Sequence, residues 1–237
     1  MLVESYNREY DDVASNRREM SAEDRKWLEI IEKGVRTVGG SYEVPLPLCD
    51  NHGPLPETRD IGLRRMHSLR KKLVKDGNYS KQYSAFITEM QQKGYAEQVT
   101  TATPGNVWYS IFLYFGVQHP DKPDKVRVVF DCASKVQVPE HQRDYLRFFW
   151  RENSLEEELR EWRVAVHQFG ACSSPSIANF VLKQTASDFG NEFSEGARFK
   201  VANNFYVDDC LRAEDSKDAL LVNLLEVKEL CKKGDLH

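Results

Sequence analysis

The amino-acid sequence predicts a mixed α+β fold in which helices flank a small antiparallel sheet. Apolar residues recur at helical spacing in several segments, for example between Met66 and Leu73. After these helical segments comes a compact β-branched run at 126–130, which predicts a strand. A later apolar segment ends at the adjacent acids Asp208 and Asp209. The predicted order of elements is helices first, then strands, a helix, a hairpin and a last helix. This order is typical of α+β domains.

Length and composition indicate an ordinary globular protein. The 237 residues suffice for one large or two small domains, and 41% hydrophobic with 30% charged residues is a common soluble mixture. The net charge of -4 does not indicate a dedicated nucleic-acid binder. The longest apolar run, 108–117, is about half of the roughly 20 residues that a spanning helix needs, and the charged N-terminus lacks a signal-peptide core. We therefore expect an intracellular protein without membrane contact.

The cysteines indicate free thiols in a reducing compartment. They are odd in number and scattered, and no Cys-x-x-Cys pair occurs. This pattern favours neither a zinc site nor a disulfide framework. The five positions are Cys49, Cys132, Cys172, Cys210 and Cys231.

A helix is expected to follow a polar lead-in of residues 1–20. Ser21 followed by Asp24 is typical of a helix start, and glycines from Gly34 onward end the segment. Beyond it, 42–48 reads as an extended, proline-punctuated stretch and 51–56 as a turn. The apolar face of this helix consists of Trp27, Leu28 and Ile31.

Two amphipathic helices are predicted over 59–75 and 80–93, separated by Gly77. The second stops at Gly94, where a glycine suits the end of a helix. The first has a basic face opposite its apolar stripe. The inward residues are Met66, Leu69 and Leu73 on the first helix, and Tyr83, Phe86, Ile87 and Met90 on the second.

The first of these helices carries a concentration of positive charge. Between Arg59 and Lys81, eight Lys or Arg residues accompany only Asp60 and Asp76. Charge alone favours a solvated helix face, and binding of nucleic-acid phosphates is the alternative. The candidate nucleic-acid-binding residues are Arg64, Arg65, Arg70, Lys71 and Lys72.

Strands and helices are expected to alternate in the C-terminal half. Strands are predicted over 126–130, 162–169 and 201–207, and a helix opens at Ser174 with Pro175 in its first turn. Trp162, Val164 and Val166 share one face of the second strand, and Ile177, Ala178, Val181 and Leu182 are the buried residues of the helix. A last helix over 216–233 is expected to bury Leu220, Leu221, Leu224, Val227 and Leu230 before Gly234 ends it.

The segment Tyr-Val-Asp-Asp at 206–209 is the sharpest candidate for chemistry. It is predicted as a strand that reaches a tip at Asp208 and Asp209, with a return strand from Cys210. Adjacent carboxylates repel each other unless a cation neutralises them, and Mg²⁺ prefers such oxygens. Two-metal phosphoryl transfer uses this arrangement. An isolated Asp-Asp pair is more often a solvated turn, so the other motifs decide between the two.

Three motifs in order resemble those of reverse transcriptases. Residues 205–210, Phe-Tyr-Val-Asp-Asp-Cys, resemble the catalytic hairpin. Residues 169–175, Phe-Gly-Ala-Cys-Ser-Ser-Pro, followed by Ala-Asn-Phe at 178–180, resemble the loop and helix that line the nucleotide and template. Residues 125–131, Lys-Val-Arg-Val-Val-Phe-Asp, resemble the fingers strand that holds the incoming triphosphate.

Further segments resemble the Pao type of retrotransposon polyprotein. They are 42–47, 63–65 with 69–70, 93–97, 119–120 and 122–125, and the resemblance extends from about Met20 to the C-terminus. It implies an RNA-directed DNA polymerase fold of fingers and palm, with an incomplete antiparallel palm sheet. In that frame, 1–40 is a polar and helical lead-in, 41–135 holds family-specific helices and a fingers-like region, and 136–237 is a partial palm.

The resemblance also implies a site. Asp208 and Asp209 would be the catalytic metal ligands for Mg²⁺ or Mn²⁺, and the partners would be an RNA or DNA template-primer with deoxynucleoside triphosphates. The implied nucleotide-binding residues are Lys125, Arg127, Phe169, Gly170 and Tyr206. Taken alone, the aromatic residues among them would be core residues, and Arg127 a solvated strand residue.

The chain departs from the family between Lys135 and Val136. There the family has a further segment with the first palm strand and its catalytic aspartate, whereas here its flanks are joined directly. Since a third carboxylate bridges both ions, we expect metal binding and polymerisation to be lost. Asp131 belongs to the fingers strand and is not expected to substitute. The loss should also leave an unpaired strand edge beside the hairpin, while 143–150 should form the helix and strand that follow the lost motif.

Two other departures are a lengthened segment at 110–115 and an end within the turn that follows the palm's last helix, so no thumb or ribonuclease H is expected. Three hypotheses therefore stand: a polymerase damaged at its metal site, a non-enzymatic remnant that binds nucleic acid through the basic helix, and an inert fragment produced by a wrongly joined gene model.

Overall fold

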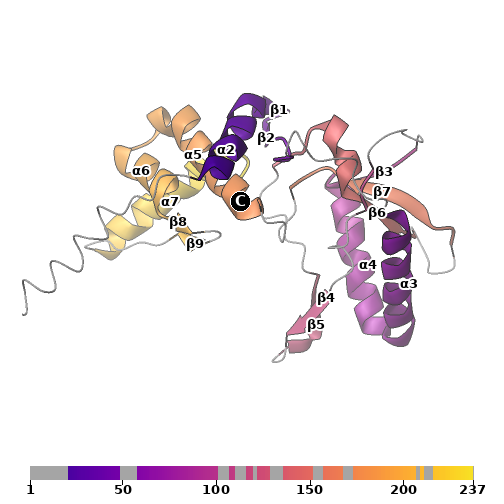
Figure 1. The fold of residues 1–237 in the computed structure, drawn as a ribbon. Coiled ribbons are helices and arrows are strands. Elements are labelled where there is room, and N and C mark those ends of the chain that lie inside the picture. The colour runs from indigo at the N-terminus through magenta and orange to yellow at the C-terminus, as the bar shows by residue number, and fades with distance from the viewer. Residues whose placement is uncertain are drawn as a thin grey trace, which may run out of the picture.

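The computed structural model describes residues 21–48, 58–100, 107–109, 116–119, 122–128, 136–151, 157–167, 173–206, 209–210 and 216–236. At 116–119, 122–128, 206 and 209 it describes the backbone alone. The chain has a mixed α+β architecture with small antiparallel sheets, as the sequence predicts (Figure 1). Within the described residues, no helix is both long and apolar enough to cross a membrane.

The helices are α2 (Ala22–Gly34), α3 (Arg59–Lys75), α4 (Gly77–Gln92), α5 (Ser174–Phe189), α6 (Glu195–Asn203) and α7 (Lys217–Lys233), with short 3-10 helices η2 (Glu140–Leu146) and η3 (Gly190–Glu192). The strands are β1 (Arg36–Val38), β2 (Ser41–Glu43), β3 (Ala96–Gln98), β4 (Gly116–His119), β5 (Lys122–Val128), β6 (Arg147–Trp150), β7 (Arg160–Val164), β8 (Phe205–Tyr206) and β9 (Asp209–Cys210).

Local signals position most helix ends. The Ser21 hydroxyl accepts a hydrogen bond from the backbone N–H of Asp24 at 3.0 Å, so α2 begins where the sequence predicts. The predicted second helix begins three residues earlier than expected, at Gly77. The reason is Asp76, whose carboxylate accepts from the N–H of Tyr79 at 2.9 Å and thereby caps α4. Gly94 has φ +70°, a left-handed conformation that suits glycine after a helix.

All the described sheets are antiparallel. β7 lies in the centre of a three-stranded sheet, with β3 on one side and β6 on the other. β1 with β2, β4 with β5, and β8 with β9 form two-stranded ladders. The strand predicted over 126–130 begins at Lys122 instead and includes Pro123, which a two-stranded edge ribbon tolerates. The expected helix and strand at 143–150 are η2 and β6.

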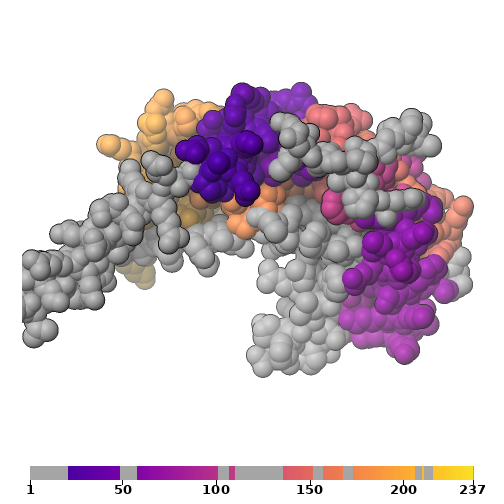
Figure 2. Space-filling model, viewed as in Figure 1, coloured from indigo at the N-terminus to yellow at the C-terminus, as the bar shows by residue number. Residues whose placement is uncertain are grey.

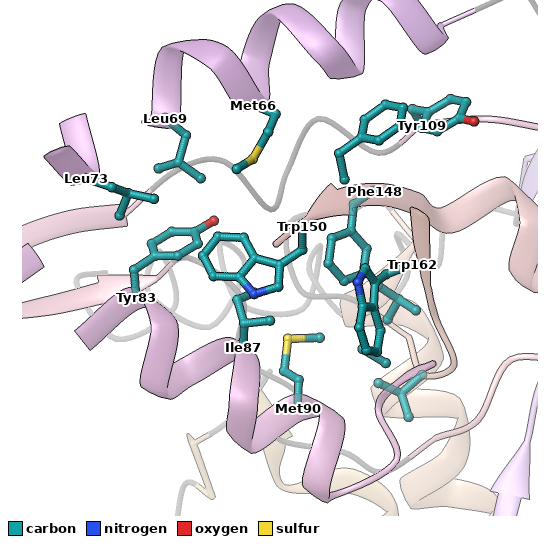
Figure 3. Close-up of a cluster of buried hydrophobic side chains, with 14 of the residues drawn as sticks. Met66, Leu69, Leu73, Tyr83, Ile87, Met90, Tyr109, Phe148, Trp150 and Trp162 are labelled. Carbon is teal, nitrogen blue, oxygen red and sulfur yellow. The ribbon is translucent and has the colours of Figure 1, made fainter. Parts of the chain in front are cut away.

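The first core cluster packs α3 and α4 against the three-stranded sheet. Trp150 on β6 lies between the side chains of the two helices (Figure 3), with its ring centroid 5.5 Å from that of Tyr83. Large aromatic side chains dominate this cluster. Its buried members are Met66, Leu69, Leu73, Tyr79, Tyr83, Ile87, Met90, Ala96, Tyr109, Phe148, Phe149, Trp150, Trp162, Val164 and Val166.

The second core cluster packs α5, α6 and α7 together with the N-terminal α2 and β2. Small residues allow close approach here, because a Cβ atom at Gly234 would overlap the side chain of Thr185. The buried members are mostly aliphatic. They are Ile31, Tyr42, Val44, Val136, Ile177, Val181, Leu182, Ala186, Ala197, Val201, Val227, Leu230 and Leu236.

Three extended segments, 42–44, 136–138 and 165–167, join the two clusters, and we call them the bridge. The central segment bonds to 42–44 on one edge and to 165–167 on the other. The N–H groups of Gln137 and Val44 donate to the carbonyls of Tyr42 and Gln137, at 2.8 and 2.9 Å. On the other edge, the N–H groups of Val138 and His167 donate to the carbonyls of Ala165 and Val136, at 2.8 and 2.9 Å.

Two expectations from the sequence are wrong, one about the strand over 201–207 and one about the buried face of the last helix. Residues 201–203 are the last turn of α6, and only 205–206 of the predicted strand are extended in the described part of it. Ser194 explains this, because its hydroxyl caps α6 at the N–H of Ala197 and Val201 is buried on the helix. On α7, Val227 and Leu230 are buried, whereas Leu221 and Leu224 are exposed and Leu220 is half-buried.

The two cores also cross the predicted segment boundaries at 40 and 135. The first cluster joins 66–109 to 148–166, and the second joins 31–44 to 177–236. Parts of the chain that are distant in sequence therefore complete each core.

Candidate functional site

The candidate catalytic hairpin is a short ladder beside the second core cluster. β8 follows the end of α6 and pairs antiparallel with β9, with Phe205 opposite Cys210 and Tyr206 opposite Asp209. Asp209 therefore begins the return strand and does not lie at the tip, where the sequence analysis placed it. Val207 and Asp208, between the paired residues, lie outside the described part of the chain.

The side chains of the two candidate metal ligands are not among those that the structure describes. Asp208 lies outside the described residues, and Asp209 is described by its backbone only. Among the described residues, no group of three or more His, Cys, Asp or Glu side chains is arranged to hold a metal ion.

The predicted nucleotide contacts do not come together in the described part. Lys125 and Arg127 lie on β5, which contacts α4, whereas the backbone of Tyr206 lies on β8, which contacts α6. Figure 1 shows the β4–β5 ribbon and the β8–β9 ribbon as separate features. Phe169 and Gly170 lie outside the described residues.

The basic helix α3 is positioned from its buried side. Gly62, Met66, Leu69 and Leu73 face the first cluster. A Cβ atom at Gly62 would lie 3.0 Å from the Cβ of Tyr109, so this glycine allows the helix to lie close against segment 107–109, between β3 and β4. At the helix start, the Thr58 hydroxyl accepts from the N–H of Tyr109 at 2.8 Å. These contacts hold the opposite face of α3 outward.

The outward face of α3 forms a cationic stripe. At about 100° per residue, Arg64, Lys71 and Lys75 project in nearly the same direction, and Arg65 and Lys72 lie along one flank. The five side chains are exposed. Asp60 and Asp76 stand at the two ends of the helix, and no acidic residue lies between them in the sequence. We call these five residues the α3 basic face; Figure 2 shows the α3–α4 pair in purple at one end of the molecule.

Arg70 does not belong to this face. It is rotated toward the buried side of α3 and is half-buried, whereas Lys75, which was not among the candidate residues, lies on the face. Local contacts position Arg64 and Lys72: the Arg64 Nε donates to the carbonyl of Asp60 at 3.3 Å, and the Lys72 ammonium lies 4.0 Å from the ring centroid of Tyr79. The helical spacing would have identified Lys75 from the sequence.

A second charged group, which the sequence analysis did not identify, lies within the first cluster. The Arg147 guanidinium is almost buried and pairs with Asp144 at 3.0 Å and with Glu161 at 2.9 Å. Burial alone would lower the pKa of Arg147, but these carboxylates raise it above its usual value. Nearby, Arg163 pairs with Glu97 at 2.6 Å. Each arginine already has carboxylate partners, so this network stabilises the sheet and is not arranged to bind an anionic ligand.

Comparison with known proteins does not assign this site, since no family model matches the chain and no curated protein matches it.

Proposed function

We propose that the chain is a reverse-transcriptase domain of the Pao retrotransposon type that has lost its polymerase activity. Three ordered motifs of the sequence, at 125–131, 169–175 and 205–210, support the ancestry. The activity that they would serve is two-metal nucleotidyl transfer, with Asp208 and Asp209 as metal ligands. In this proposal the segment that carries the third carboxylate is missing at the junction of Lys135 and Val136.

The β8–β9 ladder is the observation that carries the proposal. Its antiparallel pairing agrees with a catalytic hairpin, and in sequence it comes after the helix opened by Pro175, with η3 and α6 between them. The ladder has two strands, and no third described strand bonds to it. Two adjacent carboxylates without further ligands leave each divalent ion under-coordinated, because Mg²⁺ requires a nearly octahedral set of oxygen atoms.

Primer extension tests this proposal. The purified chain, shown to be folded by circular dichroism, is supplied with an RNA template, a DNA primer, deoxynucleotides and Mg²⁺ or Mn²⁺. We expect no extension. Extension that disappears in Asp208→Ala and in Asp209→Ala would show that the site has found a third ligand and would overturn the proposed defect. Extension that both variants retain would come from a contaminating polymerase, and the preparation would be repeated.

The α3 basic face favours a second candidate function, which is non-enzymatic binding of nucleic acid. The five cations lie on one helix face over about 17 Å, from Arg64 to Lys75, at 1.5 Å per residue. A rigid row of this kind can follow a phosphate backbone, and its contacts carry no base specificity. The helix is anchored on its other side by the first core cluster, so binding would not require it to fold.

Fluorescence anisotropy with a labelled duplex tests this second candidate. We expect affinity to fall steeply between about 50 and 200 mM salt, with a slope of roughly -0.9 per phosphate neutralised. The variant Lys71→Ala with Lys75→Ala should weaken binding to every sequence alike. A matched control is Lys228→Ala with Lys232→Ala on the exposed side of α7. Binding that is independent of salt, or equally reduced by the control, would exclude the α3 basic face as the site.

A further inference from the structure

His167 connects the two outer segments of the bridge. Its backbone N–H donates to the carbonyl of Val136 on the central segment at 2.9 Å. Its ring passes beyond that segment, and Nε2 lies 2.7 Å from the carbonyl oxygen of Val44, to which it donates. The side chain is buried, with the residue only 5% exposed. One residue thus bonds to both other segments of the bridge.

The described elements contact one another mainly within their own cluster. The helices and strands of the first cluster pack among themselves, as do α5, α6 and α7 in the second. Between the clusters, the bridge supplies backbone hydrogen bonds, and the Gln142 side chain adds one contact by accepting from the N–H of Leu46 at 2.7 Å. The bridge is therefore the place where a small energetic change can alter the coupling of the two clusters.

Within the part of the chain that the structure describes, no hydrogen bond or ion pair places an acidic side chain against the His167 ring. On the bridge, the Tyr42 hydroxyl donates to Asp188 at 2.7 Å and the Glu43 carboxylate accepts from Arg36. Two other charged groups contact the bridge or its immediate neighbours. Arg143 donates to the carbonyl of Val138 and pairs with Glu97. Asp235 accepts a hydrogen bond from the Ser41 hydroxyl. Burial lowers the pKa of His167 to about 4, against a smaller opposite effect of the Val44 carbonyl.

We propose that the bridge is an acid-sensitive joint in which protonation of His167 opens the bridge and uncouples two clusters that each remain folded. The neutral ring fits the closed bridge, because the ring is buried, its Nε2–H has the Val44 carbonyl as acceptor, and no described side chain supplies a counter-charge. A protonated ring is favoured only when the bridge opens and water reaches it.

The direction of the pH effect follows from the two states. In the open bridge the ring returns to its ordinary pKa of about 6.5, whereas in the closed bridge the pKa is about 4. Protons therefore bind the open state preferentially. The contribution of His167 to closure is complete above about pH 6.5 and is lost as the pH falls from there toward 4. At pH 5.5, the opening equilibrium should rise about tenfold relative to pH 7.5.

Amide hydrogen exchange of the full chain tests the joint, with rates corrected for the intrinsic effect of pH. At pH 5.5, the amides of Val44, Gln137, Val138 and His167 should lose about tenfold of the protection that they have at pH 7.5. Amides in the middle of α3 and α5 should keep theirs. His167→Gln, which retains a neutral N–H donor, should show bridge protection that does not depend on pH. His67→Gln, at an exposed histidine on α3, should behave like the unaltered chain.

Three outcomes would contradict the proposal that the bridge is an acid-sensitive joint. Bridge protection that is the same at both pH values would show that His167 does not control it. An equal loss in α3, α5 and the bridge would indicate global unfolding. A bridge in His167→Gln that remains as acid-sensitive as the unaltered chain would assign the effect to another group. If His167→Gln does not fold, the unaltered chain still tests the proposal, through bridge protection at the two pH values and through bridge protection relative to α3 and α5.

Discussion

The two core clusters bury their apolar side chains by different kinds of packing. The first packs a pair of helices against a sheet with aromatic side chains, and the rings of Tyr109 and Phe149 stack with centroids 4.7 Å apart. The second packs helices against helices with aliphatic and small residues, where Gly234 lies against Thr185. Broad rings fill the space above a flat sheet, whereas helices approach closely only where side chains are small.

The clusters also differ in whether their ion pairs are buried or exposed. The first includes the nearly buried Arg147, which is held by Asp144 and Glu161. In the second, the ion pair of Lys233 with Glu192 is exposed, with half of each side chain in water. Buried ion pairs are costly to break, and exposed pairs contribute little. Substitutions can therefore separate the two clusters by the kind of interaction that each depends on.

Phe148→Ala should produce the largest effect. Phe148 is 1% exposed and lies in the first cluster, so its removal leaves a cavity and should lower the free energy of unfolding by about 4 kcal/mol. Chemical denaturation, with exchange of α3 and α5 amides measured separately, checks both size and location. Phe199→Ala, at a site 61% exposed, is the control and should cost under about 1 kcal/mol. Equal loss of protection in α5 would show that the clusters unfold as one unit.

Leu230→Ala should give the corresponding effect in the second cluster. Leu230 is fully buried on α7, and its truncation should cost about 3 kcal/mol. The matched control is Leu225→Ala on the same helix, where the side chain is 63% exposed and little change is expected. Thermal unfolding of both variants distinguishes them. A large loss in Leu225→Ala would mean that the apolar face of α7 is covered in solution.

Arg147→Met should destabilise the first cluster by about 2 kcal/mol, since it leaves Asp144 and Glu161 without their nearest cation. The loss is moderated because Asp144 also contacts Arg163 and Glu161 also contacts Arg59. Adding Glu161→Gln should recover part of the loss, which a double-mutant cycle measures. Lys33→Gln in the exposed pair with Glu29 should leave the Tm unchanged. No recovery in the double variant would argue against the buried pairing.

Substitutions on the α3 basic face should have the smallest effect on folding. Lys71→Ala changes an exposed residue, so the free energy of unfolding should move by under about 0.5 kcal/mol. The slope of log affinity against log salt for duplex DNA should nevertheless become shallower by about one. Anisotropy at several salt concentrations measures the slope. An unchanged slope would place the phosphate contacts elsewhere and leave α3 as a solvated helix.

Local sequence signals predicted much of what is local in the candidate sites. The stripe of Met66, Leu69 and Leu73 predicted both the buried side of α3 and its basic opposite face. The hairpin was predicted from an apolar segment that runs into two acids, and its pairing differs by one residue. Whether Asp208 and Asp209 bind metal depends on carboxylates from distant parts of the chain, and no local pattern reports on them.

The sequence by itself determined α2, α3, α4, α5 and α7 and most of their ends, because caps and i, i+3 and i, i+4 contacts lie within a few residues, as at Ser21 and Gly94. Only the tertiary structure decided that α6 forms and includes 201–203, that Leu221 and Leu224 remain exposed, and that β7 takes β3 and β6 as its neighbours. The same holds for the bridge. The sequence indicated extended structure at 42–48 and 162–169, but the three segments come from distant regions, so their pairing arises only when both cores are assembled.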